Sequence, residues 1–391
     1  MAGNAQLMEQ TKTYLISNYG RLPVAIVRGA GSRVWDADGK EYLDFFAGFG
    51  AGGVTGHCHP AVVKAVQEQA GRLLFAGNLF TNEPQIEVAK ALSEKGFGGL
   101  SFFCHSGAEA NETALKLARL CAGEGRYQII SFHHCFHGRT MGALSLTPEK
   151  YQKGFEPMVP GNVKCTLNDL AGVEAAIDGQ TAGIFVEPVQ GEGGINLPTP
   201  EFMRGLRRLC DQHKLTLVCD EVWCAPARTG KWYAYQHYPV EPDIVTLGKA
   251  IGGGLPLAAC VARPALAEKL VPGTHGCTLG GNPVCSAAAA AVIKAIDDEH
   301  LLDAANRKGK MLLDGIRSAG IGKVKEVRGH GLMLGIQLDC LGKEAFAACM
   351  QAGLLINCTQ ETVLRLAPPL TTPDAQIAQG LDILLGVLRK G

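Results

Sequence analysis

One lysine stands where nucleophilic chemistry could occur. Lys249 follows the apolar run at residues 244–247 and shortly precedes three consecutive glycines, residues 252–254. An amine in such apolar surroundings loses hydration, which lowers its pKa and makes the neutral, nucleophilic form available. A solvated lysine at the end of a strand is the ordinary alternative, but the apolar run and the glycines disfavour it. Lys249 is therefore a candidate nucleophile.

Two acidic residues, Asp220 and Glu221, follow a second apolar run at residues 215–219. A buried carboxylate is costly unless a charged or hydrogen-bonding group meets it. The pattern is equally compatible with a carboxylate that caps a helix or forms an ion pair. Taken alone, it leaves open whether Asp220 binds a ligand or stabilises the fold.

Two stretches of small residues could bind an anion. Ser106, Gly107 and Ala108 follow the apolar run at residues 100–104 and open an amphipathic segment. Free N–H groups and the positive end of the helix dipole favour phosphate at such a helix start, although most starts of this kind are only caps. Thr278 places a hydroxyl in the glycine-rich turn at residues 276–281, where ordinary turn formation is the alternative.

These features together describe the binding site of one cofactor. Pyridoxal 5'-phosphate needs a lysine for covalent attachment and an acidic partner for its pyridine nitrogen. It also carries a phosphate that suits a helix start rich in small residues. Lys249, Asp220, residues 106–108 and Thr278 supply candidates for each requirement. The sequence therefore predicts a pyridoxal phosphate site.

An α/β fold would bring these residues together. From about residue 84, amphipathic helices alternate with short apolar segments at 100–104, 128–132, 183–186, 215–219 and 244–247. Strands that are buried on both faces and separated by helices indicate a mostly parallel sheet, and ligands bind beyond the carboxyl ends of such strands. A hairpin is expected at residues 31–46, with its turn at Asp38 and Gly39. Further strands are expected at 324–338 and 363–366.

The sequence also resembles a known family over nearly its full length. It is similar to the class III (subgroup II) aminotransferases of fold type I, which depend on pyridoxal phosphate. Eight short stretches match in order, at residues 18–23, 56–60, 106–112, 136–143, 187–194, 220–222, 228–230 and 280–283. The resemblance implies a fold like that of aspartate aminotransferase. We expect an N-terminal segment at 1–60 that is part of the small domain, a large cofactor-binding α/β domain at 61–262, and a connecting helix with a small α+β domain at 263–391.

Cofactor roles follow from the resemblance, position by position. Lys249 corresponds to the lysine that bonds covalently to the cofactor, and Asp220 to the carboxylate that keeps the pyridine nitrogen protonated. Phe136 matches the aromatic residue that stacks on the ring. The remaining cofactor contacts are expected from Ser106, Gly107, Ala108, Val222, Trp223 and Thr278. Because the family supplies the threonine from the neighbouring subunit, the resemblance implies a homodimer with shared sites.

Substrate roles follow in the same way. Arg139 and Arg365 match the two arginines that bind substrate carboxylates, and Glu192 matches the glutamate that pairs with the second of them. A bidentate guanidinium suits a substrate with two carboxylates. The implied reaction moves the δ-amino group of N2-acetyl-L-ornithine to 2-oxoglutarate, a step of arginine biosynthesis. Succinylornithine, ornithine, 4-aminobutyrate and succinyldiaminopimelate remain alternative amino donors.

At two positions the chain departs from the family pattern. Trp223 stands where the family usually has a glutamine that hydrogen-bonds the phenolic oxygen of the cofactor. An indole offers one N–H donor and no acceptor, so it could reach that oxygen only as a donor. Cys277 stands where the family has a serine near the substrate. Sequence drift with an unchanged substrate is one interpretation, and an altered pocket is the other.

Other classes of protein are less well supported by the sequence. The 391 residues carry 37 basic and 37 acidic side chains, so no overall basic charge favours nucleic acid or an anionic membrane. No secretory signal and no apolar run of about 20 residues is present, which predicts a cytoplasmic protein. Residues 57–59 and 133–137 are rich in histidine and cysteine, but their spacing matches no standard zinc motif. We therefore expect no metal, and a metal-binding or non-catalytic protein is the alternative from another class.

Overall fold

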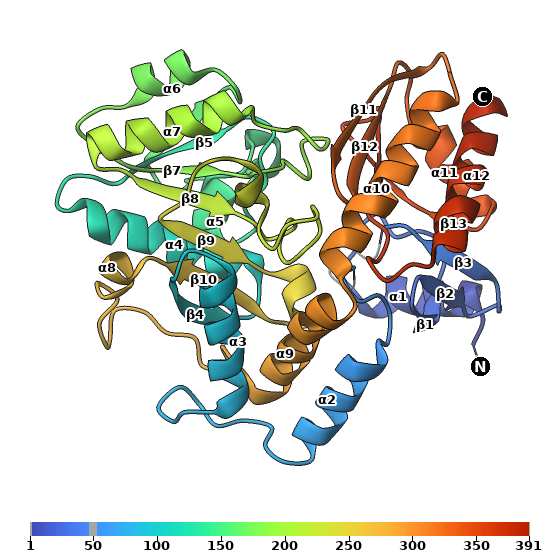
Figure 1. The fold of residues 1–391 in the computed structure, drawn as a ribbon, viewed down its shortest axis with the longest axis horizontal. Coiled ribbons are helices and arrows are strands. Elements are labelled where there is room, and N and C mark those ends of the chain that lie inside the picture. Colours follow the sequence, from blue (N-terminus) through green and yellow to red (C-terminus); the bar gives the residue numbers. More distant parts are fainter. Residues whose placement is uncertain (1, 47–52, 391) are drawn as a thin grey trace.

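A mixed, mostly parallel sheet forms the centre of the larger part of the molecule (Figure 1). The computed structural model describes residues 2–46 and 53–390. The sheet has seven strands in the order β4–β10–β9–β8–β7–β5–β6. Their bounds are β4 (Leu100–Cys104), β5 (Gln128–Phe132), β6 (Asn162–Cys165), β7 (Thr181–Val186), β8 (Thr216–Asp220), β9 (Ile244–Leu247) and β10 (Ala258–Ala262). β10 is antiparallel to β4 and β9, and the other neighbouring strands are parallel.

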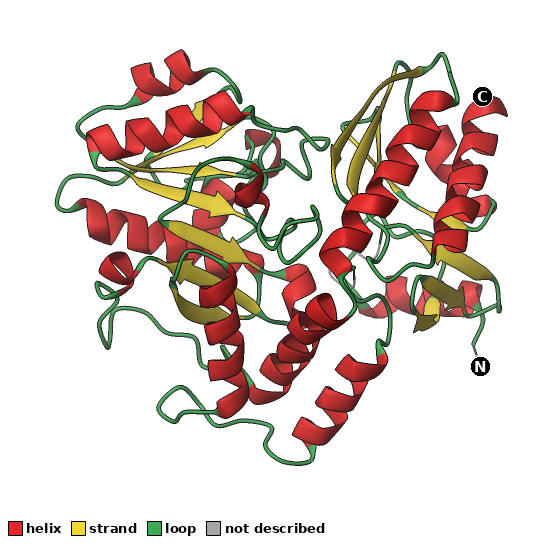
Figure 2. Ribbon diagram, in the orientation of Figure 1, coloured by secondary structure: helices red, strands yellow, loops and turns green. Residues whose placement is uncertain are grey.

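Helices cover both faces of this sheet, and its central strands β7, β8 and β9 are buried along their whole length (Figure 2). Successive residues of a strand point to opposite faces, and each face has its own core. Ile184 and Leu217 belong to the core that also contains Phe202 of α7 (Pro200–His213). Phe185 and Val218, one position further along their strands, pack with residues of α4 (Gly107–Ala122). The short helices α5 (Met141–Ser145), α6 (Leu170–Ala176) and α8 (Pro264–Ala267) complete this part.

Two smaller sheets join the ends of the chain (Figure 1). One is antiparallel, in the order β11 (Val324–His330), β12 (Met333–Leu338), β15 (Val363–Leu366) and β14 (Asn357–Thr359). The other contains β1 (Ile26–Ala30), β2 (Arg33–Asp36), β3 (Glu41–Asp44) and β13 (Leu354–Leu355). Because β13 pairs with β3, the N-terminal strands are tied to the C-terminal part of the chain. The helices of this part are α1 (Asn4–Tyr14), α10 (Leu301–Ser318), α11 (Lys343–Gln351) and α12 (Asp374–Lys390).

Three further helices lie below the central sheet in Figure 1: α2 (Pro60–Ala70), α3 (Glu83–Lys95) and α9 (Pro283–Asp298). The alanine-rich α9 contributes Ala289 and Ile293 to the core of the central sheet. It contributes Ala288 and Val292 to the core of the smaller sheets. α9 therefore joins the two cores. Among the helices of residues 2–46 and 53–390, none is long and apolar enough to cross a membrane.

The predicted fold class is confirmed. The five apolar segments are strands, although β7 begins two residues earlier than predicted and β8 is shifted by one residue. The hairpin around Asp38 and Gly39 is present as β2 and β3, and Gly39 has the positive φ of 88° that such a turn requires. The pattern did not single out β6 and β10. The division of the chain at residues 60 and 262 stays a prediction.

Candidate active site

A cavity of about 230 Å³ lies where the central strands end. Its lining contains one residue or more after each of five strands: Gly107 after β4, Phe136 after β5, Glu187 after β7, Asp220 at the end of β8 and Lys249 after β9. In open α/β sheets, this edge is the usual place for ligands. The parallel order of the strands thus brings together residues that are more than 100 positions apart.

The start of α4 supplies a possible phosphate site. Ser106 caps the helix, and its hydroxyl accepts a hydrogen bond from the N–H of Glu109 at 3.3 Å. The Glu109 carboxylate accepts the Ser106 N–H in return at 2.8 Å, which completes a capping box. A Cβ atom at Gly107 would lie 2.4 Å from Cγ1 of Val222, so only glycine fits there. The first turn can therefore present backbone N–H groups to an anion at close range.

Lys249 lies at the end of β9 in a strained backbone conformation. Its φ is +47°, in the left-handed region that side chains other than glycine rarely adopt. Such strain persists only where the surroundings enforce it, and it is common at functional sites. Burial lowers the pKa of the Lys249 amine, although the negative charges of Asp220 and Glu192 oppose the shift. The neutral amine is therefore more available than in a solvated lysine.

Asp220 forms a buried ion pair with His137 at the base of the cavity. Nδ1 of His137 lies 2.7 Å from Oδ2 of Asp220. Burial opposes a charge on the imidazole, but the neighbouring Cys135 and Asp220 outweigh it and raise the pKa of His137 to about 10. Asn111 also donates to Oδ2, at 2.7 Å, and the N–H of Val222 donates to Oδ1 at 3.0 Å. Asp220 is thus held in one orientation next to a cation.

Phe136 and Arg139 come from the loop after β5. A buried carboxylate, Glu187, accepts the N–H of Phe136 at 3.0 Å, and burial raises the pKa of Glu187. The exposed guanidinium of Arg139 lies 4.3 Å from the ring centroid of Tyr151 and 5.4 Å from that of Phe136. This loop therefore gives the cavity one aromatic face and one cation.

Arg365 on β15 is almost completely buried and is bound to Glu192. Its Nη1 donates to Oε1 of Glu192 at 2.9 Å and to the carbonyl of Gly191 at 2.8 Å. Its Nε donates to Oδ1 of Asn357 at 2.9 Å. Burial lowers the pKa of Arg365, and the charge of Glu192 opposes that shift. The pair places a partly exposed carboxylate next to a buried arginine that several hydrogen bonds hold in place.

Trp223 separates Lys249 from Arg365. The centroid of its indole lies 5.3 Å from the Lys249 amine and 4.7 Å from the Arg365 guanidinium. A Cβ atom at Gly191 would lie 2.1 Å from the indole, so that glycine makes room for the ring. The buried Nε1 of Trp223 has no hydrogen-bond partner within the part of the chain that the structure describes. An unsatisfied buried donor costs about 1–3 kcal/mol, and a ligand acceptor in the cavity would remove that cost.

The structure brings most of the predicted site residues together. The cavity is lined by Gly107, Ala108, Phe136, Arg139, Glu192, Asp220, Val222, Trp223 and Lys249. Arg365 reaches it through Glu192. Ser106, Cys277 and Thr278 do not line it: the Ser106 hydroxyl belongs to the helix cap, and Thr278 is exposed on a loop. An exposed Thr278 is compatible with the predicted role toward a neighbouring subunit, which stays a prediction.

Sequence analysis missed Asn111, His137 and Glu187 as members of the site. All three lie within the family-like stretches at 106–112, 136–143 and 187–194. Their place in these stretches is the one feature of the sequence that could have identified them. Their roles depend on contacts with Asp220 and Phe136, which only the folded chain reveals.

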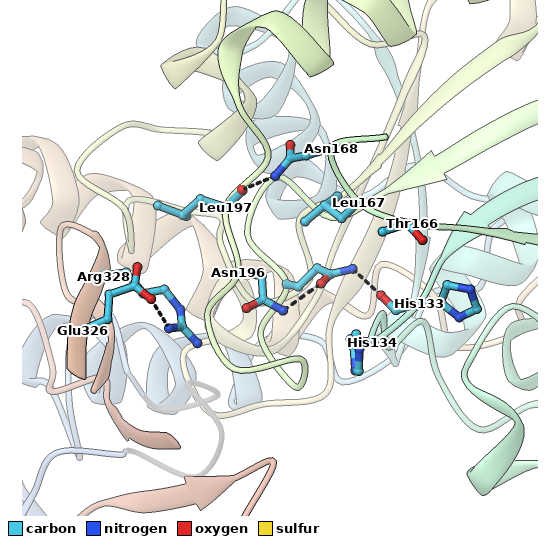
Figure 3. A pocket seen from close by; sticks show the side chains of 10 residues that line it. His133, His134, Thr166, Leu167, Asn168, Asn196, Leu197, Glu326 and Arg328 are labelled. Atoms are coloured by element: carbon cyan, nitrogen blue, oxygen red, sulfur yellow. Dashed lines mark hydrogen bonds and ion pairs between the residues drawn. The ribbon is translucent and has the colours of Figure 1, made fainter. Parts of the chain in front are cut away.

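A larger cavity of about 550 Å³ lies beside His133 and His134 (Figure 3). Its polar side chains bind one another or the backbone: Gln190 donates to the carbonyl of His133 at 2.8 Å, and Arg328 pairs with Glu326 at 2.7 Å. Its lining contains no lysine and no helix start rich in small residues. The chemistry that the sequence predicts therefore belongs to the smaller cavity.

The histidines of the two clusters rich in histidine and cysteine contact different residues. His57 pairs with Asp44, and His59 pairs with Glu299, both at 2.8 Å. His133 and His134 are exposed, whereas His137 is buried against Asp220. Histidines that are close in sequence thus lie in different surroundings in the folded chain.

Known proteins are similar to this chain over nearly its full length. Residues 14–388 match the family described as aminotransferase class-III. An acetylornithine aminotransferase from Caldanaerobacter subterraneus subsp. tengcongensis is 44% identical over 387 residues, covering 96% of this chain and 98% of the relative. A succinylornithine transaminase from Salmonella paratyphi A is 41% identical, covering 96% and 94%. A solved ornithine aminotransferase of Toxoplasma gondii, with partial occupancy of PLP at its active site, is 33% identical with a TM-score of 0.94, covering 98% and 94%.

Proposed function

The chain belongs to the class-III aminotransferases, which are enzymes that use pyridoxal 5'-phosphate, and we propose that it transfers the δ-amino group of N2-acetyl-L-ornithine to 2-oxoglutarate. The products are N-acetyl-L-glutamate 5-semialdehyde and L-glutamate, as in arginine biosynthesis. The single observation that carries the proposal is the Arg365–Glu192 pair beside Lys249. The name of the relative that is 44% identical supports the same donor. A cytoplasmic location is part of this proposal.

The residues of the cavity fit the cofactor. When bound, pyridoxal phosphate supplies an aldehyde that bonds to amines and a cationic ring that withdraws electrons from the neighbouring carbon. Lys249 would hold it covalently, and the N–H groups of Gly107 and Ala108 would bind its phosphate. Asp220, held in place by His137, would accept a hydrogen bond from the protonated pyridine nitrogen. Further contacts would come from Phe136, Val222 and Trp223 in the lining, and from Ser106 and Thr278, which lie outside it.

Lys249 would also move the proton of the reaction. Its Nζ lies in the cavity, and burial lowers its pKa, so the free amine can accept a proton from the substrate carbon that carries the amino group. The same Nζ can then return the proton at the neighbouring atom. A base is most effective when its pKa lies near the working pH. The lowered pKa of Lys249 is a shift in that direction.

Arg365 and Glu192 would allow one pocket to serve two substrates. 2-Oxoglutarate has two carboxylates, and Arg139 and Arg365 could bind one each in a bidentate manner. The amino donor has only one carboxylate, so it leaves one arginine without an anion. Glu192, already 2.9 Å from Arg365, would neutralise that arginine while the donor is bound. Glu192 would move away from Arg365 when 2-oxoglutarate binds.

Arg365→Lys and Glu192→Gln should separate these two half-reactions. Arg365→Lys keeps a positive charge but loses the planar fork, so we expect the KM for 2-oxoglutarate to rise by about tenfold or more. Glu192→Gln should mainly slow the half-reaction with the amino donor, because Arg365 then remains charged and unpaired. Single-turnover kinetics of each half-reaction measure both effects. Equal losses in both half-reactions of Glu192→Gln would contradict the role of Glu192.

Trp223 should influence the cofactor through its N–H group. Trp223→Phe preserves an aromatic ring beside Arg365 but removes the donor, whereas Trp223→Gln retains one. We expect the pH at which the visible absorbance of the bound cofactor changes to shift further in Trp223→Phe than in Trp223→Gln. The measurement is a spectroscopic pH titration without substrate. Identical titrations in all three proteins would show that the indole serves only for packing.

A homodimer is part of the proposal. Large apolar side chains are exposed in two segments: Tyr14, Ile16 and Tyr19 in the first, and Leu79 and Phe80, which are 96% and 72% exposed, in the second. Leaving so many apolar groups in water is unfavourable, and a second subunit would cover them. Thr278 would then complete the partner's site. Light scattering of the holoenzyme tests the dimer, and a monomer with full activity would contradict it.

The amino donor is tested by steady-state kinetics. N2-acetyl-L-ornithine, N2-succinyl-L-ornithine, L-ornithine and 4-aminobutyrate would each be measured against 2-oxoglutarate. We expect the highest kcat/KM for N2-acetyl-L-ornithine. N2-succinyl-L-ornithine is the second candidate, because a relative that is 41% identical is a succinylornithine transaminase. A higher kcat/KM for N2-succinyl-L-ornithine would show that this compound, and not N2-acetyl-L-ornithine, is the amino donor.

A further inference from the structure

Three side chains that can bind a metal ion meet outside the cavity. His105 and Glu109 flank the start of α4, and Cys277 lies on the loop before α9. Nδ1 of His105 lies 3.1 Å from Oε1 of Glu109 and 3.5 Å from Sγ of Cys277. One ligand atom from each residue lies within 4.8 Å of the others. This is the one such set of three found in residues 2–46 and 53–390.

The distances between these atoms resemble those around a tetrahedral zinc ion. Zinc binds sulfur at about 2.3 Å and nitrogen or oxygen at about 2.0–2.2 Å, so neighbouring ligand atoms are about 3.3–3.6 Å apart. Two of the three separations, 3.1 and 3.5 Å, lie close to this range. The third, between Cys277 and Glu109, is at most 4.8 Å. A small movement of the Cys277 thiol would bring all three ligand atoms within binding distance of one ion.

The carboxylate of Glu109 is held in place by its surroundings. Oε2 of Glu109 accepts the N–H groups of His105 and Ser106 at 3.0 and 2.8 Å, and the Ser106 hydroxyl at 2.9 Å. These bonds fix the carboxylate and leave Oε1 directed at His105. Hydrogen bonds that orient ligand side chains are typical of metal sites. Glu109 therefore has an oxygen available for a metal without loss of the helix cap.

The loop that carries Cys277 is also anchored. Asn78 donates to the carbonyls of Cys277 and Gly280 at 2.9 and 3.0 Å. A Cβ atom at Gly280 would lie 2.1 Å from the carbonyl oxygen of Phe103, so the loop packs directly on β4. The thiol consequently stays near His105, although 172 positions separate them in sequence.

We propose that His105, Glu109 and Cys277 form a binding site for a zinc-type divalent ion, with the fourth position left to water or another ligand. Thiolate, imidazole and carboxylate together favour zinc over magnesium or calcium, which prefer oxygen ligands alone. The ordinary alternative is a hydrogen-bonded set in which the imidazole links the carboxylate and the thiol without any metal. The test below separates the two.

The site lies next to residues that the proposed function assigns to the cofactor. Cys277 precedes Thr278, and His105 and Glu109 enclose residues 106–108. A bound ion would join the loop before α9 to the start of α4. Binding itself does not depend on the proposed function, because none of the three ligands lines the cavity.

Equilibrium dialysis of the holoenzyme against zinc tests the proposal, without substrate and after removal of metals. We expect one zinc per chain. Cys277→Ser and His105→Asn should each weaken binding by at least tenfold, of the order found when metal sites are perturbed. Cys58→Ser and Cys340→Ser remove exposed thiols elsewhere and should leave binding unchanged. Cobalt as a probe should give a sulfur-to-metal absorption band that Cys277→Ser lacks.

A second measurement uses the unaltered protein. Zinc should protect Cys277 from alkylation by iodoacetamide, with the modified peptide identified by mass spectrometry, while Cys340 reacts at an unchanged rate. Absence of stoichiometric zinc, equal affinity in Cys277→Ser, or unprotected alkylation of Cys277 would each overturn the proposal. Each of these results would leave the set as a hydrogen-bonded cluster. None of them bears on the transaminase reaction, which the donor kinetics test separately.

Discussion

Lys249→Ala abolishes transamination: we expect the turnover number to fall by a factor of about 10³ or more. Proton transfer by a positioned side chain alone contributes about 10²–10⁴ to a rate. Loss of the amine also removes the group that would hold the cofactor covalently. Lys249 is the one lysine in the lining of the cavity, so no described neighbour can replace it. Turnover with saturating cofactor and substrates measures the effect.

A matched control distinguishes this loss from a general effect of removing a lysine. Lys153 is exposed and outside the cavity, so Lys153→Ala should retain normal turnover. Borohydride reduction of the unaltered holoenzyme should fix the cofactor on the peptide that contains Lys249. If Lys249→Ala keeps turnover within tenfold of the unaltered enzyme, or if the label lies on another lysine, the assignment is wrong.

The sequence predicted those site residues that lie at the ends of apolar strands. Lys249, Asp220 and Gly107 each follow such a run, and parallel strands bring their carboxyl ends to one edge. The direction of β10 could not be predicted, because its small residues carry no signal for parallel or antiparallel pairing. Contacts between residues far apart in sequence could not be predicted either, such as that of Asn111 with Asp220, which are 109 positions apart.

Residues that could bind a metal also show what sequence patterns fail to predict. His57, Cys58 and His59 are neighbours in sequence, yet in the structure the two histidines pair with different carboxylates. His105 and Cys277 share no pattern and nonetheless touch, because the loop before α9 packs on β4. Local spacing predicts a ligand set only when the ligands lie on one turn or helix. The absence of a zinc motif therefore says little about sites built from distant segments.

Asp220→Asn should lower turnover by about 10² or more, and it should also destabilise the protein. Asparagine has nearly the same volume but no charge, so it cannot keep a pyridine nitrogen protonated. It also leaves His137 buried without its ionic partner. Breaking a buried pair by removing one partner costs about 3–5 kcal/mol. Chemical denaturation at pH 6 should therefore show a reduced free energy of unfolding.

The pH dependence of that destabilisation follows from the pKa of His137. Burial opposes the imidazolium, but Cys135 and Asp220 raise its pKa from 6.5 to about 10 in the folded protein. A raised pKa stabilises the folded state fully below the unfolded value and loses this effect as the pH rises through the folded value. The difference in unfolding free energy between the unaltered protein and Asp220→Asn should therefore be largest below pH 6.5. It should shrink as the pH approaches 10.

Asp243→Asn is a matched control that separates catalysis from stability. Asp243 also forms a largely buried pair, with Arg207 at 2.8 Å, and accepts the N–H of Leu217, but it lies outside the cavity. Its loss should lower the free energy of unfolding and leave turnover within about threefold of normal, because no reacting group depends on it. Asp220→Asn should lower both. If Asp220→Asn loses stability but keeps its turnover, the carboxylate serves only to hold His137, and another group must act on the pyridine nitrogen.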